Sequence, residues 1–296
     1  MHAWPVRGRV HGRIADNGLG METIDRAYFA DIYRLVNSDE YSEAKGGGVR
    51  PEILDARDLP WNHTNLAELG LKAVQLVKKT GTCLVHFDAS AGYDRVFDWQ
   101  QSVFGSYRFD SSVASKPFSE IVAKEDGKYF ANTHFAQPMH SDEAHTADPP
   151  RVISLYCRKQ SQQGGVSTLV NIHAWLKTLA DMGDIDSACF AMGALQINGA
   201  RGALNRPLLV LDHTDVLCPF PSILREATGD EKVISLYRDV MAWAHQTENQ
   251  MRFRMMEGQL LLIDNYKVLH GRTGFRLDDP RMLLRACFGS QALQST

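Results

Sequence analysis

Three residues in the sequence have side chains that can together bind a metal ion. His140 and Asp142 are separated by one residue, and on an extended strand such side chains point to the same side, because they alternate with a period of two. A third candidate ligand, His270, lies far downstream. Two imidazoles and one carboxylate on one face, with three coordination positions left open, suit non-haem Fe(II) and oxygen activation. The sequence therefore predicts an iron site.

Spacing alone leaves other pairings open, because the chain has 11 histidines. Asp142 with His145, or His140 with Glu143, can also pair across a turn. A lone histidine is more often a hydrogen-bonded or exposed residue than a metal ligand. We expect this of four other histidines: His134, His173, His213 and His245.

The size and charge of the chain limit the classes of function. With 296 residues, of which 44% are hydrophobic, it can bury a sizeable core, and we expect a single domain over residues 1–296. A net charge of -3 without a long run of like charge argues against a nucleic acid or an anionic membrane as partner. No stretch approaches the roughly 18 apolar residues of a membrane span, and residues 1–20 lack an apolar signal core. We therefore expect a cytoplasmic protein that acts on a small molecule.

The cysteines do not form a recognisable framework. They are odd in number, widely spaced and never in a C-x-x-C pair, which argues against a zinc site or a set of disulfides. Two of them, Cys157 and Cys287, lie in apolar runs and are expected to be buried thiols. The five are Cys83, Cys157, Cys189, Cys218 and Cys287.

Two helices are predicted near the start of the chain. Apolar residues at helical spacing indicate a helix from Met21 to about Asn37, followed by a glycine-rich break. A second helix is predicted from Asn65 to Lys79, with Asn65 as its cap and Gly81 as its end. We expect these helices to decorate the core from about residues 1–80.

The rest of the chain favours a mainly β fold with flanking helices. A β-prone run follows Gly81 directly, and residues 97–130, which have no clear period, are expected to form loops that border a site. Many short strands with late helices indicate an antiparallel sandwich or barrel with helices packed outside. Strands are expected at 82–87, 152–157, 167–172, 208–212, 251–256, 259–264 and 282–288, and helices at about 173–182 and 230–246.

Motifs around the candidate ligands resemble, in order, those of a known family. After His140-x-Asp142 come Pro149-Pro150, the run 152–157 and Gly164-Gly165-x-Ser167-Thr168. Near the end come Asp264-Asn265-x4-His270-Gly271-Arg272, Phe275, Arg281 and Arg285. This ordered set, over roughly residues 130–290, is similar to the taurine dioxygenase and clavaminate synthase-like superfamily of Fe(II)/2-oxoglutarate-dependent oxygenases.

The resemblance implies a double-stranded β-helix, or jelly roll, from about residues 81–290, with an insertion at about 183–230. It implies that His140, Asp142 and His270 hold iron, with 2-oxoglutarate as co-substrate and O2 as oxidant. Arg281 matches the arginine that holds the distal carboxylate of 2-oxoglutarate. Thr168 matches its hydroxyl partner, with the neighbouring Ser167 as the alternative. Related halogenases lack the carboxylate ligand, so the presence of Asp142 argues against halogenation.

The residue types suit these roles on physical grounds. A planar guanidinium can bind a carboxylate through two parallel hydrogen bonds and keeps its charge. A neighbouring hydroxyl can satisfy a remaining lone pair. Gly164-Gly165 allows a tight turn that a Cβ would obstruct, which can aim the hydroxyls that follow.

The resemblance leaves the substrate open. In the taurine dioxygenase branch the position of Arg285 faces substrate, so this residue meets either an anionic or polar group of the substrate or an ordinary salt-bridge partner. His145 and Ser167 are further candidates for substrate contacts. The polar, charged character of residues 97–130 and 183–230 suggests a small polar or amino-acid-like metabolite, as in natural-product biosynthesis.

The implied reaction is hydroxylation of an unactivated C–H bond, with decarboxylation of 2-oxoglutarate to succinate and CO2. A desaturase or cyclase of the same family is an alternative. Two rivals from other classes remain. One is a cupin-like metal- or metabolite-binding protein without activity, which would have no reason to place Arg281 beside Thr168. The other is a zinc hydrolase that uses His140, His145 and a carboxylate.

Overall fold

The computed structural model describes the greater part of the chain. The described residues are 21–108, 118–127, 130–144, 146, 148–172, 174–175, 194–199, 202–207, 209–210, 215–216, 224–289 and 291–293. Several predictions fall outside them: those for His145, His173, His213, Cys189 and Cys218, for most of the helix at 173–182 and for much of the insertion at 183–230.

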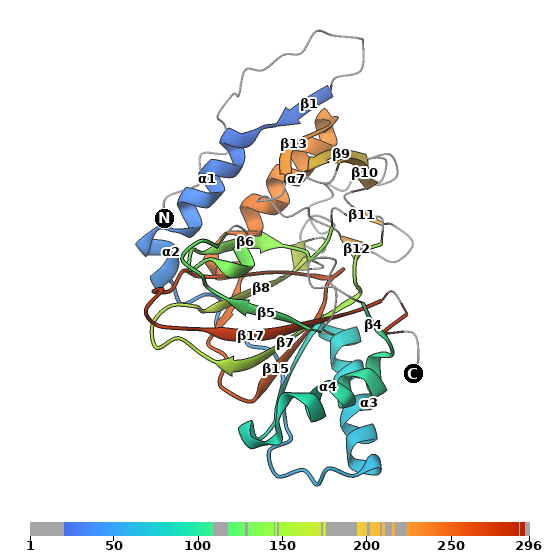
Figure 1. Ribbon diagram of the computed structural model, residues 1–296. Coiled ribbons are helices and arrows are strands. Elements are labelled where there is room, and N and C mark those ends of the chain that lie inside the picture. Colours follow the sequence, from blue (N-terminus) through green and yellow to red (C-terminus); the bar gives the residue numbers. More distant parts are fainter. Residues whose placement is uncertain are drawn as a thin grey trace.

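Two facing sheets form the centre of the molecule (Figure 1). The smaller sheet has the order β14 (Met251–Phe253), β8 (Ser167–Asn171), β16 (Val268–Arg272) and β6 (Gln137–His140). The larger has the order β2 (Ile53–Asp55), β3 (Thr82–His86), β15 (Gln259–Asp264), β7 (Val152–Lys159), β17 (Met282–Phe288) and β4 (Tyr107–Arg108), and β5 (Ser119–Val122) also pairs with β17. These neighbours are antiparallel except β2 and β3. The predicted mainly β, jelly-roll fold is confirmed.

Alternation along β17 decides which side chains face the space between the sheets. Leu283 and Cys287 pack in the apolar cluster that joins the two sheets. Leu284 and Ala286 pack in a different cluster, on the outer face. Arg285 has the same parity as Leu283 and Cys287, so it faces inward with them. Arg281 precedes the strand by one residue and also lines the cavity between the sheets.

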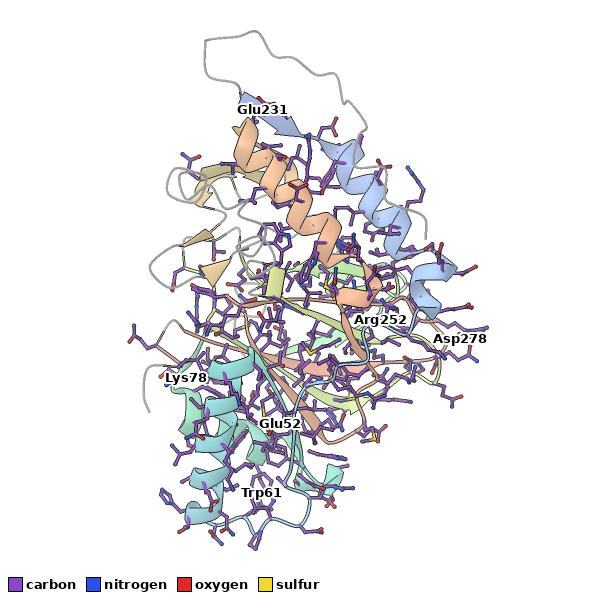
Figure 2. The ribbon with its side chains drawn as sticks, turned by 180° about the vertical axis from the view of Figure 1, so that it is seen from behind. Glu52, Trp61, Lys78, Glu231, Arg252 and Asp278 are labelled. Atoms are coloured by element: carbon purple, nitrogen blue, oxygen red, sulfur yellow. The ribbon has the colours of Figure 1, made fainter. Side chains whose placement is uncertain are left out.

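Helices cover the outer faces of both sheets. The larger sheet packs against α3 (His63–Thr80) and α4 (Tyr93–Phe104), and the smaller against α1 (Arg26–Val36) and α7 (Glu231–Ala244). Figure 2 shows Glu231, the first residue of α7, at one end of the molecule and Trp61, which precedes α3, at the other. Helix α7 also contacts a third sheet of order β1, β13, β9, β10. The remaining elements are β1 (Met21–Ile24), α2 (Asp39–Glu43), η1 (Ala89–Ala91), η2 (Phe130–Asn132), β9 (Ala194–Gly199), β10 (Gly202–Pro207), β11 (Leu209–Val210), β12 (Asp215–Val216), β13 (Leu224–Asp230) and η5 (Thr247–Asn249).

The two predicted N-terminal helices exist, but both starts were wrong. Strand β1 occupies Met21–Ile24 because it pairs with β13, and α1 begins after Asp25, whose carboxylate accepts hydrogen bonds from the first turn. Helix α3 begins at His63, and the cap is Asn62, which accepts a hydrogen bond from the Asn65 backbone. Gly81 ends α3 as predicted, with φ of 85°.

The prediction of loops over residues 97–130 was wrong for the end of α4 and for the short strands β4 and β5. Helix α4 continues to Phe104, and its apolar side Val96, Phe97 and Trp99 is buried against the larger sheet. The helix begins at Tyr93, so a stretch that starts at residue 97 omits its first turn and contains too little of the helix for its apolar period to be recognised.

Among the described helices, none combines the length and apolar character needed to cross a membrane.

Gly81 gives a test of how α3 is joined to the sandwich. A Cβ on this residue would lie 2.5 Å from Val268 Cγ2 and would sit at a positive φ. We expect Gly81→Ala to lower the free energy of unfolding by about 2–4 kcal/mol, from left-handed backbone strain and overpacking together. Urea unfolding measures this. Gly48→Ala is the control, because Gly48 also has a positive φ but a Cβ added there would have no atom within 4 Å; an equal loss for both variants would contradict the packing explanation.

Candidate active site

Strands β6 and β16 bring His140 and His270 together. The two residues are cross-strand partners, and their ring centroids are 4.2 Å apart. The spacing suggested that Asp142 lies on the same strand as His140, and this was wrong. Strand β6 ends at His140, and Asp142 lies in the turn that follows. Asn265 fixes this turn: its side chain accepts from the Asp142 N–H at 2.8 Å and donates to the Asp142 carbonyl at 2.9 Å.

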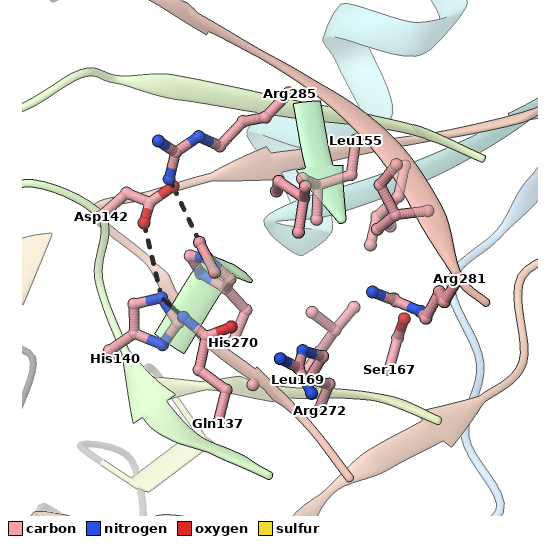
Figure 3. Close-up of a pocket in the computed structure, with 15 residues that line it drawn as sticks. Gln137, His140, Asp142, Leu155, Ser167, Leu169, His270, Arg272, Arg281 and Arg285 are labelled. Carbon is pink, nitrogen blue, oxygen red and sulfur yellow. Dashed lines mark hydrogen bonds and ion pairs between the residues drawn. The ribbon is translucent and has the colours of Figure 1, made fainter. Parts of the chain in front are cut away.

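The turn still carries the Asp142 carboxylate to both imidazoles. Its Oδ1 lies 3.4 Å from His140 Nε2 and its Oδ2 lies 3.9 Å from His270 Nε2. One ligating atom from each of the three buried residues lies within 4.8 Å of the others. Figure 3 shows the three side chains converging on one end of a cavity. The set fits a divalent ion such as Fe(II), whereas His145 lies outside the described residues.

The surroundings favour the protonation states that a metal ion requires. Burial raises the pKa of the Asp142 carboxyl, but the Arg285 guanidinium, whose NH1 donates to Oδ2 at 3.0 Å, and the two neighbouring imidazoles outweigh it and hold this pKa well below its usual range. Burial lowers the pKa of His270 to about 3, and the proximity of His140 acts in the same direction. An ionised carboxylate and a neutral imidazole are the forms that bind metal.

The other end of the cavity carries a buried cation. Arg281 lies there with Ser167 (Figure 3). Burial lowers its pKa to about 10, so it stays charged at neutral pH. Its Nε donates to Gln160 Oε1 at 3.3 Å, and no carboxylate of the described residues forms an ion pair with it. A buried guanidinium without a counter-ion there fits the carboxylate of an incoming molecule.

The prediction that Thr168 is the hydroxyl beside Arg281 disagrees with the geometry. Ser167 lines the cavity, as Leu169 does two residues later on β8. Thr168 has the opposite parity, and its hydroxyl contacts Met139 Sδ at 4.0 Å on the outer face of the sheet. Strand alternation therefore makes Ser167, the alternative named from the sequence, the better candidate for the hydroxyl beside Arg281.

Two residues that line the cavity, Arg272 and Gln137, were given no role from the sequence. Arg272 alternates with His270 on β16, and its guanidinium donates to the backbone carbonyls of Phe130, Thr133 and Phe135. Burial and the charge of Arg281 lower the pKa of Arg272 to about 9. Gln137 places its amide nitrogen 3.1 Å from His140 Nε2. The alternation His270-Gly-Arg272 was a usable signal for the arginine, whereas nothing local marked Gln137.

Comparison with known proteins identifies the family. The family model for the taurine catabolism dioxygenase TauD, TfdA family matches residues 77–182 and 205–287, more than half of the chain. The chain belongs to this family. Among curated proteins, no sequence matches it.

Solved structures share the fold of this TauD/TfdA family member. An asparagine oxygenase is 15% identical with a TM-score of 0.61, over 90% of this chain and 92% of the other. PvcB from Pseudomonas aeruginosa is 14% identical with a TM-score of 0.60, over 96% of each chain. A taurine dioxygenase from Burkholderia xenovorans is 15% identical with a TM-score of 0.57, over 81% of this chain and 90% of the other.

Family membership confirms the enzyme class and the cofactors expected from the sequence motifs. The protein is a dioxygenase that depends on Fe(II), 2-oxoglutarate and O2. This agrees with the candidate ligand set at one end of the cavity and the buried arginine at the other. The cupin-like and zinc-hydrolase alternatives are therefore set aside.

The buried imidazole of His270 predicts a pH dependence of stability. Its pKa falls from 6.5 to about 3 on folding, so between these values the unfolded state binds one more proton. The free energy of unfolding of chelator-treated protein should then decrease as pH falls from about 6.5, by roughly 1.4 kcal/mol per pH unit for this group. His270→Gln should remove that part of the slope in urea titrations. His63→Gln is the control, because His63 is exposed; identical slopes for all three proteins would refute the prediction.

Proposed function

We propose that this dioxygenase hydroxylates an unactivated C–H bond of a small polar or amino-acid-like metabolite, with release of succinate and CO2. The iron ligands are His140, Asp142 and His270. The distal carboxylate of 2-oxoglutarate is held by Arg281 with Ser167. The observation that carries this proposal is a single cavity with a two-histidine, one-carboxylate set at one end and a buried arginine without a carboxylate partner among the described residues at the other.

Several cavity residues have distinct tasks in this reaction. When bound, Fe(II) would activate O2, with one oxygen atom going to the succinate that is formed by oxidative decarboxylation of 2-oxoglutarate and the other to the hydroxylated carbon of the substrate. The protein provides the donor atoms, and Arg285 holds the Asp142 carboxylate in place through Oδ2. Four leucines form the apolar wall that limits water around the reacting groups: Leu155, Leu169, Leu261 and Leu283.

The substrate class rests on two supports. Arg285 lines the cavity next to the ligand set, although its ion pair with Asp142 shows that a salt bridge is at least part of its role. An anionic group of a substrate would have to share this guanidinium with Asp142. Among the structures with this fold, an asparagine oxygenase was solved with Fe(II), a hydroxyasparagine and succinate. An amino-acid-like substrate of natural-product biosynthesis is consistent with both.

Succinate formation tests the proposal directly. The purified protein, supplied anaerobically with Fe(II) and then with 2-oxoglutarate, ascorbate and air, should form succinate, and a screen of amino acids and related metabolites should reveal compounds that stimulate it. His140→Ala and His270→Ala should lower the rate to that of the protein without iron. His134→Ala is the control, because His134 does not line the cavity. Activity that needs zinc and ignores 2-oxoglutarate would overturn the proposal.

The two neighbouring hydroxyls on β8 give a sharper test of co-substrate binding. Ser167→Ala should raise the KM for 2-oxoglutarate about fivefold, the equivalent of one hydrogen bond of about 1 kcal/mol. Thr168→Val should leave it nearly unchanged because its side chain faces the other side. Arg281→Met should raise it about a hundredfold or more, as expected for loss of a buried charge pair. The assignment is wrong if Thr168→Val raises this KM and Ser167→Ala does not.

A further inference from the structure

Strand β6 contains one residue more than its partner beside the metal-ligand histidines. His140 is paired with His270 and Gln137 with Arg272, so two residues of β6, Pro138 and Met139, lie opposite Gly271 alone. Such an extra residue breaks the ladder and leaves backbone groups without their usual partners. Gly271 suits this crowded place, because a Cβ there would lie 2.6 Å from the Gln137 carbonyl oxygen.

The peptide unit between Pro138 and Met139 is held by a histidine on each side. Its carbonyl oxygen accepts a hydrogen bond from His140 Nδ1 at 2.9 Å. Its N–H donates to His245 Nε2 at 3.1 Å. The peptide is trans, so the carbonyl and the N–H point in opposite directions. The unit therefore links the ring of His245 to the ring of His140.

The position of His245 is itself fixed by helix α7. It is the first residue after the helix, and its Nδ1 donates to the Met241 carbonyl at 2.7 Å. The side chain is buried, at 5% exposure. With Nδ1 as the donor, Nε2 carries the lone pair that the Met139 N–H requires. Burial lowers the pKa of His245 to about 4, so the ring is neutral at physiological pH.

We propose that His245 is a positioning residue for the metal centre. By accepting the Met139 N–H, it fixes the rotation of the peptide unit whose carbonyl orients His140. That carbonyl keeps the proton of His140 on Nδ1, and Nε2 is then turned into the cavity as a donor to the ion. The inference rests on the proposed function, because it takes His140 as a metal ligand.

The physical reason is that, among the described residues, His245 provides the acceptor for the Met139 N–H. A buried N–H without an acceptor is costly, so loss of the His245 acceptor would favour rotation of the unit toward another partner. Rotation would move the carbonyl away from His140 and free its ring to turn or change tautomer. Hydrogen bonds in such a chain also polarise one another, which raises the basicity of the ligand.

Two substitutions separate this role from a structural one. In His245→Gln, the side-chain carbonyl can reach the place of Nε2 and accept from the Met139 N–H. In His245→Asn, the shorter amide can replace only the Nδ1 contact to Met241. Both lose the ring, so both should lower the free energy of unfolding of chelator-treated protein similarly. We expect His245→Asn to weaken Co(II) binding about 10- to 100-fold and to change the Co(II) absorption spectrum, and His245→Gln to keep both near wild type.

Val240→Ala is the matched control for packing around the end of α7, because Val240 is a fully buried side chain of this helix and belongs to the same apolar cluster as Met241 and Ala244. It should lower stability without changing Co(II) affinity. The inference is overturned if His245→Asn and His245→Gln bind Co(II) like the wild type, or if affinity falls in step with stability in all three variants. If His140→Ala instead bound Co(II) with the affinity of the wild type, the proposed ligand set would be overturned.

Discussion

The ionic contact between Arg285 and Asp142 is the interaction on which the arrangement of the cavity depends. Both side chains are largely withdrawn from solvent, at 16% and 9% exposure. A buried carboxylate without compensation would take up a proton instead of remaining charged. Arg285 outweighs that tendency, and Asn265 holds the turn on which Asp142 lies. The charge and position of the Asp142 carboxylate therefore depend on a residue of β17 and on another that follows β15, both far away along the chain.

Two other buried arginines of the cavity, Arg272 and Arg281, differ in their hydrogen-bond partners. The terminal nitrogens of Arg272 donate hydrogen bonds to three backbone carbonyls of residues 130–135, and these bonds attach this segment to the wall of the cavity. Arg281 contacts Gln160 through Nε only, within the hydrogen bonds of the described residues, and a Cβ on Gly165 would lie 2.9 Å from its Cδ. One guanidinium thus supports the protein backbone, while the other presents its terminal nitrogens to the cavity for a molecule that brings its own negative charge.

The motifs pointed to five residues that the fold brings to the same cavity, because order along the chain survives when identity is low. His140, Asp142, His270, Arg281 and Arg285 all line the one cavity. What failed was the choice of face: Ser167 and Thr168 differ by one position, and only the pairing of β8 with β16 shows which of them points inward. His245 had no signal at all, because its contact with Met139 spans 106 residues and depends on the extra residue in β6. In the sequence, a lone histidine that follows a helix has the same pattern whether or not its ring accepts a hydrogen bond from a distant strand.

Register is therefore the property that joins fold to chemistry in this protein. Arg281 and Arg285 are four residues apart, which places them roughly 13 Å apart along an extended chain, with one at each end of the cavity. Leu283 lies between them and packs into the cluster that joins the two sheets. A slip of β17 by one residue against β7 would turn both guanidinium groups toward α3 and α4 and place Leu284 in the cavity. The apolar contacts that fix this register thereby also set the distance between the proposed iron ligands and the proposed co-substrate carboxylate site.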